Sequence, residues 1–132
     1  MVHALTTAAI GTLAAGSVDK PVQWGAMIVA FSVAPTITET PDAEMAEAVA
    51  RAVAIVRASG LPNETTAMFT TIEGEWDEVF GVIKEATEAV VAVSPRVSLV
   101  VKADIRPGRT GMLTQKVRSL EEALEKQAGD NA

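Results

Sequence analysis

The chain has 132 residues, of which 48% are hydrophobic and 21% charged, a mix typical of one globular domain with a single core. Its net charge of −6 argues against the basic surface that a general nucleic-acid binder needs. The absence of cysteine excludes disulfides and thiolate metal sites, and a lone histidine, His3, leaves little basis for zinc binding or serine–histidine catalysis.

Residues 1–26 differ in composition from the rest, because they are rich in Ala, Thr and Gly and carry only two charged residues, Asp19 and Lys20. A weak apolar run from Ala4 to Gly16 resembles part of an export signal, but no Lys or Arg precedes it, and it is too short to span a bilayer. We expect residues 1–26 to be a flexible extension, or an upstream start with the domain opening at Met27. The alternative is an export signal. A cytoplasmic location is favoured.

The first regular element is predicted at residues 27–35 (MIVAFSVAP), a short β-branched and aromatic run that ends at a proline. A helix follows, with Thr40 as N-cap, Pro41 as first residue and Ser59–Gly60 as its end. Apolar residues at helical spacing give this helix one stripe: Met45, Val49, Ala52, Val53 and Val56.

Residues 63–72 (NETTAMFTTI) predict either one bent strand or a hairpin of two short strands, with the turn unplaced. A second helix is predicted from about Glu75 to Ser94–Pro95, and residues 96–105 (RVSLVVKADI) are the clearest strand. After a loop at residues 106–111, the last helix has apolar residues at steps of four, three and four, and residues 128–132 should fray. These apolar residues are Leu113, Val117, Leu120 and Leu124.

This order of elements predicts an α+β fold over residues 27–127, a ferredoxin-like βαββαβ sandwich with an additional C-terminal helix. Such a sheet leaves one face without helices of its own, yet the predicted strands supply apolar residues to both faces. Exposing apolar surface costs roughly 25 cal/mol per Å². We therefore expect sheets to pack together in a homo-oligomer.

The segment TTIEGEWDEVF, residues 70–80, is acidic. Three of its carboxylates, Glu75, Asp77 and Glu78, fit the first turn of a helix, where unpaired N–H groups favour negative charge. Glu73 stands at the end of a strand, where it either faces a ligand or lies on the surface. The segment has neither the opposed environments of an acid–base pair nor the spacing of a calcium loop, so neither a catalytic residue nor a metal is expected.

Two further sets of polar residues can each be interpreted in two ways. The loop RPGRTG, Arg106 to Gly111, either binds an anion or is a turn with solvated arginines. Lys102 and Asp104, two apart on a strand, share one face and form either a rim ion pair or part of a polar pocket.

Three blocks in this order resemble the small bacterial and archaeal thiamine-binding proteins. They are SVAP at Ser32–Pro35, the string TTIEGEWDEV at residues 70–79, and the pattern RV…KxDxR at residues 96–106. The resemblance covers Met27 to about Leu124. It departs at Phe69, where the family usually has Gly, and at Thr87, where it often has His.

The resemblance implies a ferredoxin-like subunit that forms dimers or tetramers through its sheets. It further implies reversible, non-catalytic binding of thiamine or its hydroxymethylpyrimidine portion. We expect no cofactor, and the charge and the short apolar run argue against nucleic acid and membrane as partners. The ligand-binding residues expected on this basis are Ser32, Pro35, Met68, Phe69, Thr70, Glu73, Lys102 and Asp104.

A thiamine site needs hydrogen-bonding groups along the pyrimidine edge, an aromatic flank and negative potential near the cationic ring. Phe31, Phe69 or Trp76 would supply the flank. Two alternatives are an oligomeric structural or regulatory module that binds partner proteins through its sheet face, and an enzyme that uses Glu73 as a base.

Overall fold

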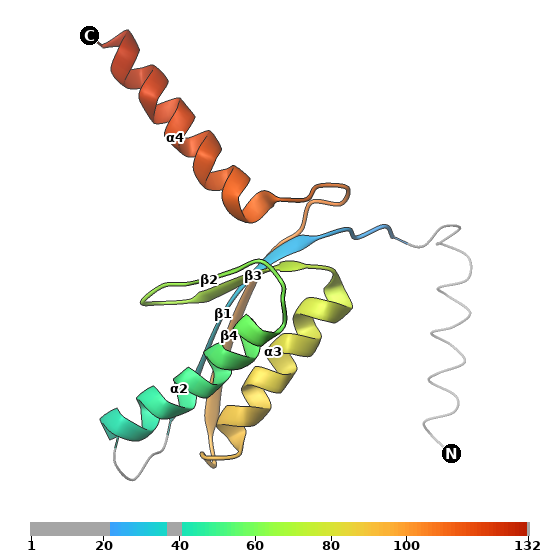
Figure 1. Cartoon of the computed structure of the whole chain (residues 1–132), viewed down its shortest axis with the longest axis vertical. Coiled ribbons are helices and arrows are strands. Elements are labelled where there is room, and N and C mark those ends of the chain that lie inside the picture. The colour runs from blue at the N-terminus through green and yellow to red at the C-terminus, as the bar shows by residue number, and fades with distance from the viewer. Residues whose placement is uncertain (1–21, 37–40, 132) are drawn as a thin grey trace, which may run out of the picture.

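The computed structural model describes residues 22–36 and 41–131. In this part of the chain a four-stranded antiparallel sheet is combined with helices (Figure 1). The elements are β1 (Met27–Pro35), α2 (Pro41–Ala58), β2 (Asn63–Thr65), β3 (Thr70–Gly74), α3 (Trp76–Val91), β4 (Val97–Asp104) and α4 (Met112–Asp130). The predicted α+β, ferredoxin-like architecture with an additional C-terminal helix is confirmed.

The sheet has the strand order β2-β3-β1-β4, which makes β1 a central strand and β4 an edge strand. Val29 of β1 lies opposite Ile72 of β3 and Ala103 of β4. Because side chains alternate along a strand, every second residue of β1 from Met27 onward points to one face and is buried. Helices α2 and α3 cover this face (Figure 1).

The core lies between this face and the two helices. Helix α3 contributes Val79, Ile83, Ala86 and Val90 at steps of four, three and four, so that one stripe is buried. From α2 come Ala48, Ala52 and Val56, each 2% exposed or less. Small residues on α2 allow that helix to approach the sheet closely.

The segment at residues 63–72 is a hairpin of two short strands rather than one bent strand. Its turn spans Thr66–Phe69, where the Thr66 backbone N–H donates to the Phe69 carbonyl over 2.9 Å. The Thr66 hydroxyl oxygen also lies 3.4 Å from the Met68 amide and 3.3 Å from the Phe69 amide, which donate to it. A threonine side chain therefore builds this turn without glycine or proline.

Helix α4 leaves the α/β body and projects away from α2 and α3 (Figure 1). Met112 at its start is the buried residue of this helix. The helix continues to Asp130, so it includes residues 128–130 of the segment for which fraying is expected. Three residues of its apolar stripe, Val117, Leu120 and Leu124, are 52%, 60% and 54% exposed.

Most of the segment expected to be an N-terminal extension, residues 1–21, lies outside the described residues. Its last part, residues 22–26, leads into β1 without helix or strand. Within the described ranges, no helix combines the length and apolarity that crossing a membrane requires.

Candidate functional site

A hollow of about 170 Å³ lies where the β2–β3 hairpin, β1 and α2 meet. It is bordered by two phenylalanines, several small aliphatic residues and a group of hydroxyl-bearing residues. Its lining consists of Phe31, Ser32, Val33, Ala34, Val49, Ala52, Val53 and residues 65–70. Four of the eight predicted site residues belong to this lining: Ser32, Met68, Phe69 and Thr70.

The polar groups of this hollow come mainly from the hairpin. Thr70 is buried, and its hydroxyl lies 3.5 Å from that of Thr65, a distance at the limit for a hydrogen bond. Each hydroxyl has one donor and two acceptor sites, so this weak pair leaves capacity for a ligand. The edge of a polar heterocycle could therefore be recognised here.

The apolar wall is set by strand alternation. Phe31 lies opposite Thr70 and faces the same side of the sheet as the helices, where it is 2% exposed. Ser32 follows it in the strand, so its side chain turns to the opposite face, and we infer that its main chain borders the hollow. The hairpin turn supplies the half-buried Phe69, while Met68 at the tip is 74% exposed.

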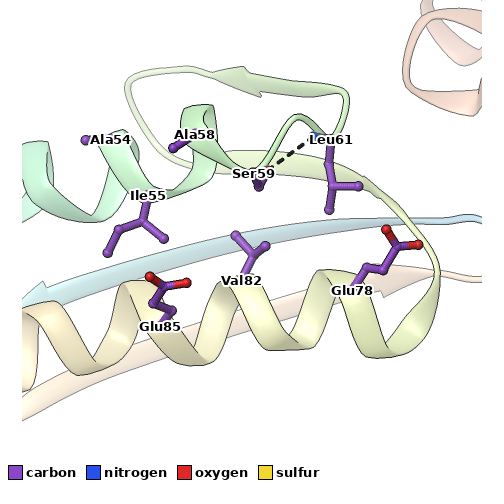
Figure 2. Close-up of a pocket in the computed structure, with 8 residues that line it drawn as sticks. All are labelled: Ala54, Ile55, Ala58, Ser59, Leu61, Glu78, Val82 and Glu85. Atoms are coloured by element: carbon purple, nitrogen blue, oxygen red, sulfur yellow. Dashed lines mark hydrogen bonds between the residues drawn. The ribbon is translucent and has the colours of Figure 1, made fainter.

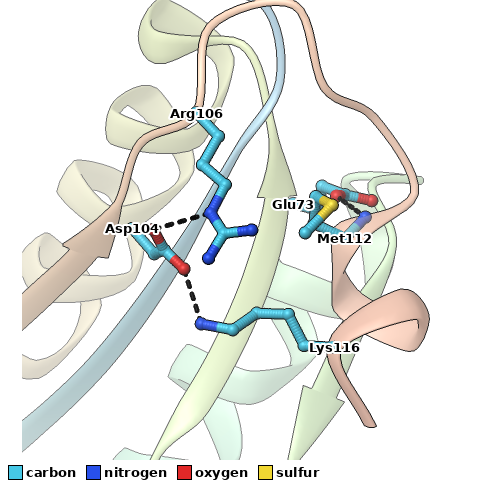
Figure 3. Close-up of polar contacts among 5 residues, drawn as sticks. All are labelled: Glu73, Asp104, Arg106, Met112 and Lys116. Atoms are coloured by element: carbon cyan, nitrogen blue, oxygen red, sulfur yellow. Dashed lines mark hydrogen bonds and ion pairs between the residues drawn. The ribbon is translucent and has the colours of Figure 1, made fainter. Parts of the chain in front are cut away.

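Glu73 lies outside this hollow. It pairs with Ile28 on the face opposite the helices and is 5% exposed. Its Oε2 accepts a hydrogen bond of 2.5 Å from the Met112 backbone N–H, the first residue of α4 (Figure 3). A carboxylate at a helix N-terminus meets both an unpaired N–H group and the positive end of the helix dipole. Glu73 thus fastens α4 to the sheet.

Lys102 and Asp104 share one face of the sheet, as predicted from their spacing, and the structure shows that Glu73 lies on the same face. Asp104 binds Lys116 of α4 at 2.5 Å and lies 3.9 Å from Arg106 (Figure 3). The Lys116 ammonium, which donates a hydrogen bond, lowers the pKa of the Asp104 carboxyl; partial desolvation opposes this, and the charges of Arg106 and Lys102 add to the lowering. The ion pair between Asp104 and Lys116 therefore also attaches the N-terminal end of α4, here called its root, to the sheet.

Pro35 is the eighth predicted site residue, and it lies apart from both groups. It closes β1 opposite Val97, buried on the helix-covered side. The predicted set is therefore divided among the hairpin hollow, the root of α4 and the far end of β1.

A second hollow, of about 510 Å³, lies between α2 and α3 (Figure 2). Ile55 and Val82 project into it from the two helices, and the carboxylates of Glu78 and Glu85 stand beside it. None of the predicted site residues lines this groove. Across the described residues, His, Cys, Asp and Glu do not gather in threes in a way that could hold a metal.

Sequence reasoning missed Thr65 and Thr66 as parts of the hairpin hollow. The signal was present in the threonine-rich segment at residues 63–72, but its turn could not be located, so the faces of its threonines stayed unassigned. It also missed the bond between Glu73 and Met112, which are 39 residues apart.

The chain is similar to proteins of one family. A family model described as thiamine-binding protein matches residues 29–121. A UPF0045 protein of Mycobacterium bovis is 50% identical over 99 residues, which cover 74% of this chain and 94% of the relative.

Solved structures share the fold. A domain of unknown function from Bacillus cereus has a TM-score of 0.63 and 29% identity, covering 74% of this chain and 92% of that domain. A candidate thiamine biosynthesis/salvage protein from Thermotoga maritima has a TM-score of 0.61 and 22% identity, covering 71% of this chain and 98% of that protein. The match to the family model and the identity with the mycobacterial relative show that this chain belongs to the thiamine-binding protein family.

Proposed function

We propose that the protein binds thiamine or its hydroxymethylpyrimidine portion reversibly and without catalysis, as a carrier, buffer or sensor. Membership of the thiamine-binding protein family is the observation that carries this proposal. The Thermotoga maritima protein of the same fold, a candidate for thiamine biosynthesis or salvage, points in the same direction.

The hairpin hollow is the proposed site. The hydroxyls of Thr65 and Thr70 would pair with the nitrogen-bearing edge of the pyrimidine, and Phe69 would lie against the ring. Small-molecule sites combine apolar walls with a few convergent polar groups, and this lining has that character. Because its described residues include no carboxylate, the neutral pyrimidine fits the hollow better than the cationic thiazolium does.

The volume of the hollow suits the pyrimidine part of thiamine better than the whole molecule. Pockets for drug-sized molecules usually enclose about 300–1,000 Å³, whereas this hollow has about 170 Å³. Phe69 occupies space that a smaller residue would leave open. We therefore place the pyrimidine ring inside and the rest of thiamine at the mouth.

Assembly into a homo-oligomer, a dimer or tetramer in the cytoplasm, is part of the proposal. The edge strand β4 exposes Leu99, Val100 and Val101 by 42%, 51% and 38%, so apolar side chains are uncovered on both of its faces. Together with the stripe on α4, these residues favour burial against another copy of the chain.

Titration calorimetry with thiamine and with hydroxymethylpyrimidine tests the binding proposal. We expect saturable heat and a ligand-dependent rise in Tm, since ligand at about 100 times its Kd stabilises the folded state by about 2.7 kcal/mol. Mass spectrometry of the ligand after long incubation should recover it unchanged. Heat and Tm that do not respond at millimolar concentrations of either compound would contradict the proposal.

Two threonines on one strand give a matched pair of variants. Thr70→Val removes a hydroxyl that faces the hollow, whereas Thr71→Val changes the neighbouring residue, which points to the opposite face beside Ala30. We expect only Thr70→Val to weaken pyrimidine binding. Equal loss in both variants would show that the ligand does not occupy this hollow.

A structural or regulatory module is the second candidate, favoured by the half-buried Phe69 that narrows the hollow and by the exposed apolar residues of β4 and α4. Phe69→Gly discriminates between the two candidates. The ligand-binding proposal expects the original protein to bind thiamine and this variant to bind it more weakly, because the ring loses the aromatic side chain against which it would lie. Under the module proposal neither the original protein nor the variant would bind it, and partner proteins would be retained instead.

A further inference from the structure

A third hollow, of about 450 Å³, lies at the opposite end of β3, where the acidic segment begins α3. Three separate parts of the chain form it: residues 22–25 before β1, residues 75–77 at the start of α3, and Gly108 in the loop after β4. It shares no lining residue with the hairpin hollow. Any ligand it takes is therefore bound by a different set of groups.

Two of the residues that line this hollow are tryptophans. The rings of Trp24 and Trp76 have centroids 5.4 Å apart and are tilted by 38°, and Phe80 continues the row with its centroid 4.6 Å from that of Trp76. Core packing would bury such rings, yet Trp24 and Trp76 are 40% and 41% exposed. Two indoles thus remain accessible in one concave place.

The backbone beside the first tryptophan passes close to the loop after β4. Gly25 has a φ of +61° and passes so close to Gly108 that a Cβ on it would lie 3.2 Å from the Gly108 nitrogen. Gly108 also has a positive φ, of +83°. A larger residue at Gly25 would be strained and crowded, so this glycine allows residues 22–25 to approach the loop after β4 closely.

The charge in this hollow is negative. Glu75 and Asp77 line it, and no Lys or Arg stands among its described lining residues. The side chain of Glu75, although at the N-cap of α3, makes no capping hydrogen bond. Its carboxylate is therefore available to an approaching ligand, and partly exposed indole rings beside carboxylates are complementary to a cation.

We propose that this hollow binds a small organic cation with an alkylated nitrogen. Cation–π attraction is strongest at Trp, and a quaternary ammonium, which cannot donate hydrogen bonds, loses little hydration when it lies against a ring. Glu75 and Asp77 would add long-range attraction. The chain would then have two separate sites, one for an uncharged heterocycle and one for a cation.

Intrinsic fluorescence reports on this hollow alone, because Trp24 and Trp76 are the only tryptophans of the chain. Choline chloride and its uncharged analogue of the same shape, 3,3-dimethylbutan-1-ol, would be titrated at constant chloride concentration. We expect a saturable fluorescence change with choline and none with the alcohol. An equal response to both would overturn the proposal, since charge would then play no part.

Charge variants test which groups attract the cation. The double variant Glu75→Gln/Asp77→Asn should weaken choline binding at least threefold, while Glu121→Gln/Glu122→Gln on α4 changes net charge equally and should leave it unaltered. Trp24→Phe, with Trp76 as the remaining reporter, should weaken it about two- to fivefold. Unchanged affinity in the first double variant would refute the site.

Competition separates this site from the proposed pyrimidine site. Saturating hydroxymethylpyrimidine should leave the choline titration unchanged, because the two hollows share no residues. A displaced choline curve would refute the existence of two independent sites. Choline binding with no pyrimidine binding would refute the proposed function and support the cation site.

Discussion

Glu73 illustrates how one residue can be assigned a role only when its partner is known. Its place at the end of a strand allowed a ligand contact, but the structure gives it a buried hydrogen bond to the Met112 N–H. This bond uses one of the acceptor positions of the carboxylate, and the side chain is only 5% exposed. The carboxylate is therefore tied to α4 in the form of the protein described.

Replacing Glu73 by Ala should lower the free energy of unfolding by about 1.5–3 kcal/mol, the usual range for a hydrogen bond to a charged group. Amide hydrogen exchange in the first turn of α4 should accelerate, because the Met112 N–H loses its acceptor. Glu121→Ala, at an exposed position on the same helix, is the control for loss of one carboxylate. Exchange that stays as slow as in the original chain would contradict this role.

The structure lowers the pKa of the Asp104 carboxyl, and the hydrogen bond from Lys116 is the largest cause. A carboxyl whose folded pKa lies below its unfolded pKa stabilises the fold above the unfolded value. That contribution disappears as the pH falls through the lower, folded value. The contact between α4 and β4 should therefore weaken only in acid, below about pH 4.

The Lys116→Met variant should raise the titration midpoint of the Asp104 side-chain carbon followed by carbon-13 NMR. The hydrogen bond and the nearest positive charge are both removed, which favours the protonated acid. Lys126→Met on the same helix makes no such contact in the described residues and serves as control. An identical midpoint in all three proteins would show that Lys116 does not hold Asp104 in solution.

At the scale of elements, the hairpin turn depends on one side chain. Thr66→Ala removes the hydroxyl that accepts from the Met68 and Phe69 amides, while Thr66→Ser keeps it. We expect the alanine variant to lose about 0.5–1.5 kcal/mol of unfolding free energy, measured by urea denaturation. It should also bind the pyrimidine more weakly, because the turn carries Phe69. Equal stability of both variants would rule out this role.

The elements differ in how far the sequence determines them. The bounds predicted for β1 are confirmed, because a β-branched run closed by Pro35 leaves little ambiguity. The turn at Thr66–Phe69 could not be placed, because it has none of the Gly, Pro or Asn residues that mark turns. Its geometry arises from a side chain that hydrogen-bonds to amides two and three residues ahead.

The candidate site was predicted less completely than the fold. Local spacing correctly put Lys102 and Asp104 on one face, since alternation along a strand is a local property. Which loops meet at a hollow is decided by tertiary packing. The spacing of residues in the sequence therefore could not predict that Trp24 lies beside Trp76. Nor could it predict that Glu73 and Thr70 lie on opposite faces of the sheet.

At the scale of the whole molecule, the described part of a single chain leaves apolar residues of β4 and α4 exposed. Within residues 22–36 and 41–131 no strand pairs with the outer edge of β4, and Val100 lies on the face that α2 and α3 do not cover. Leu120 lies in the middle of the α4 stripe. A free edge and an uncovered helix stripe on the same subunit are typical of a chain that completes its core with another copy.

Light scattering after gel filtration should therefore give a mass that is a multiple of 13.8 kDa. Val100→Glu and Leu120→Glu should each shift the protein toward the monomer, because a carboxylate buried in an apolar contact is costly unless it is paired. Gln115→Glu adds the same charge on the side of α4 away from the stripe and should leave the mass unchanged. A monomer in the original chain would mean that α4 and β4 stay exposed to water. Their apolar residues would then have to be explained by a different partner, as the module hypothesis requires.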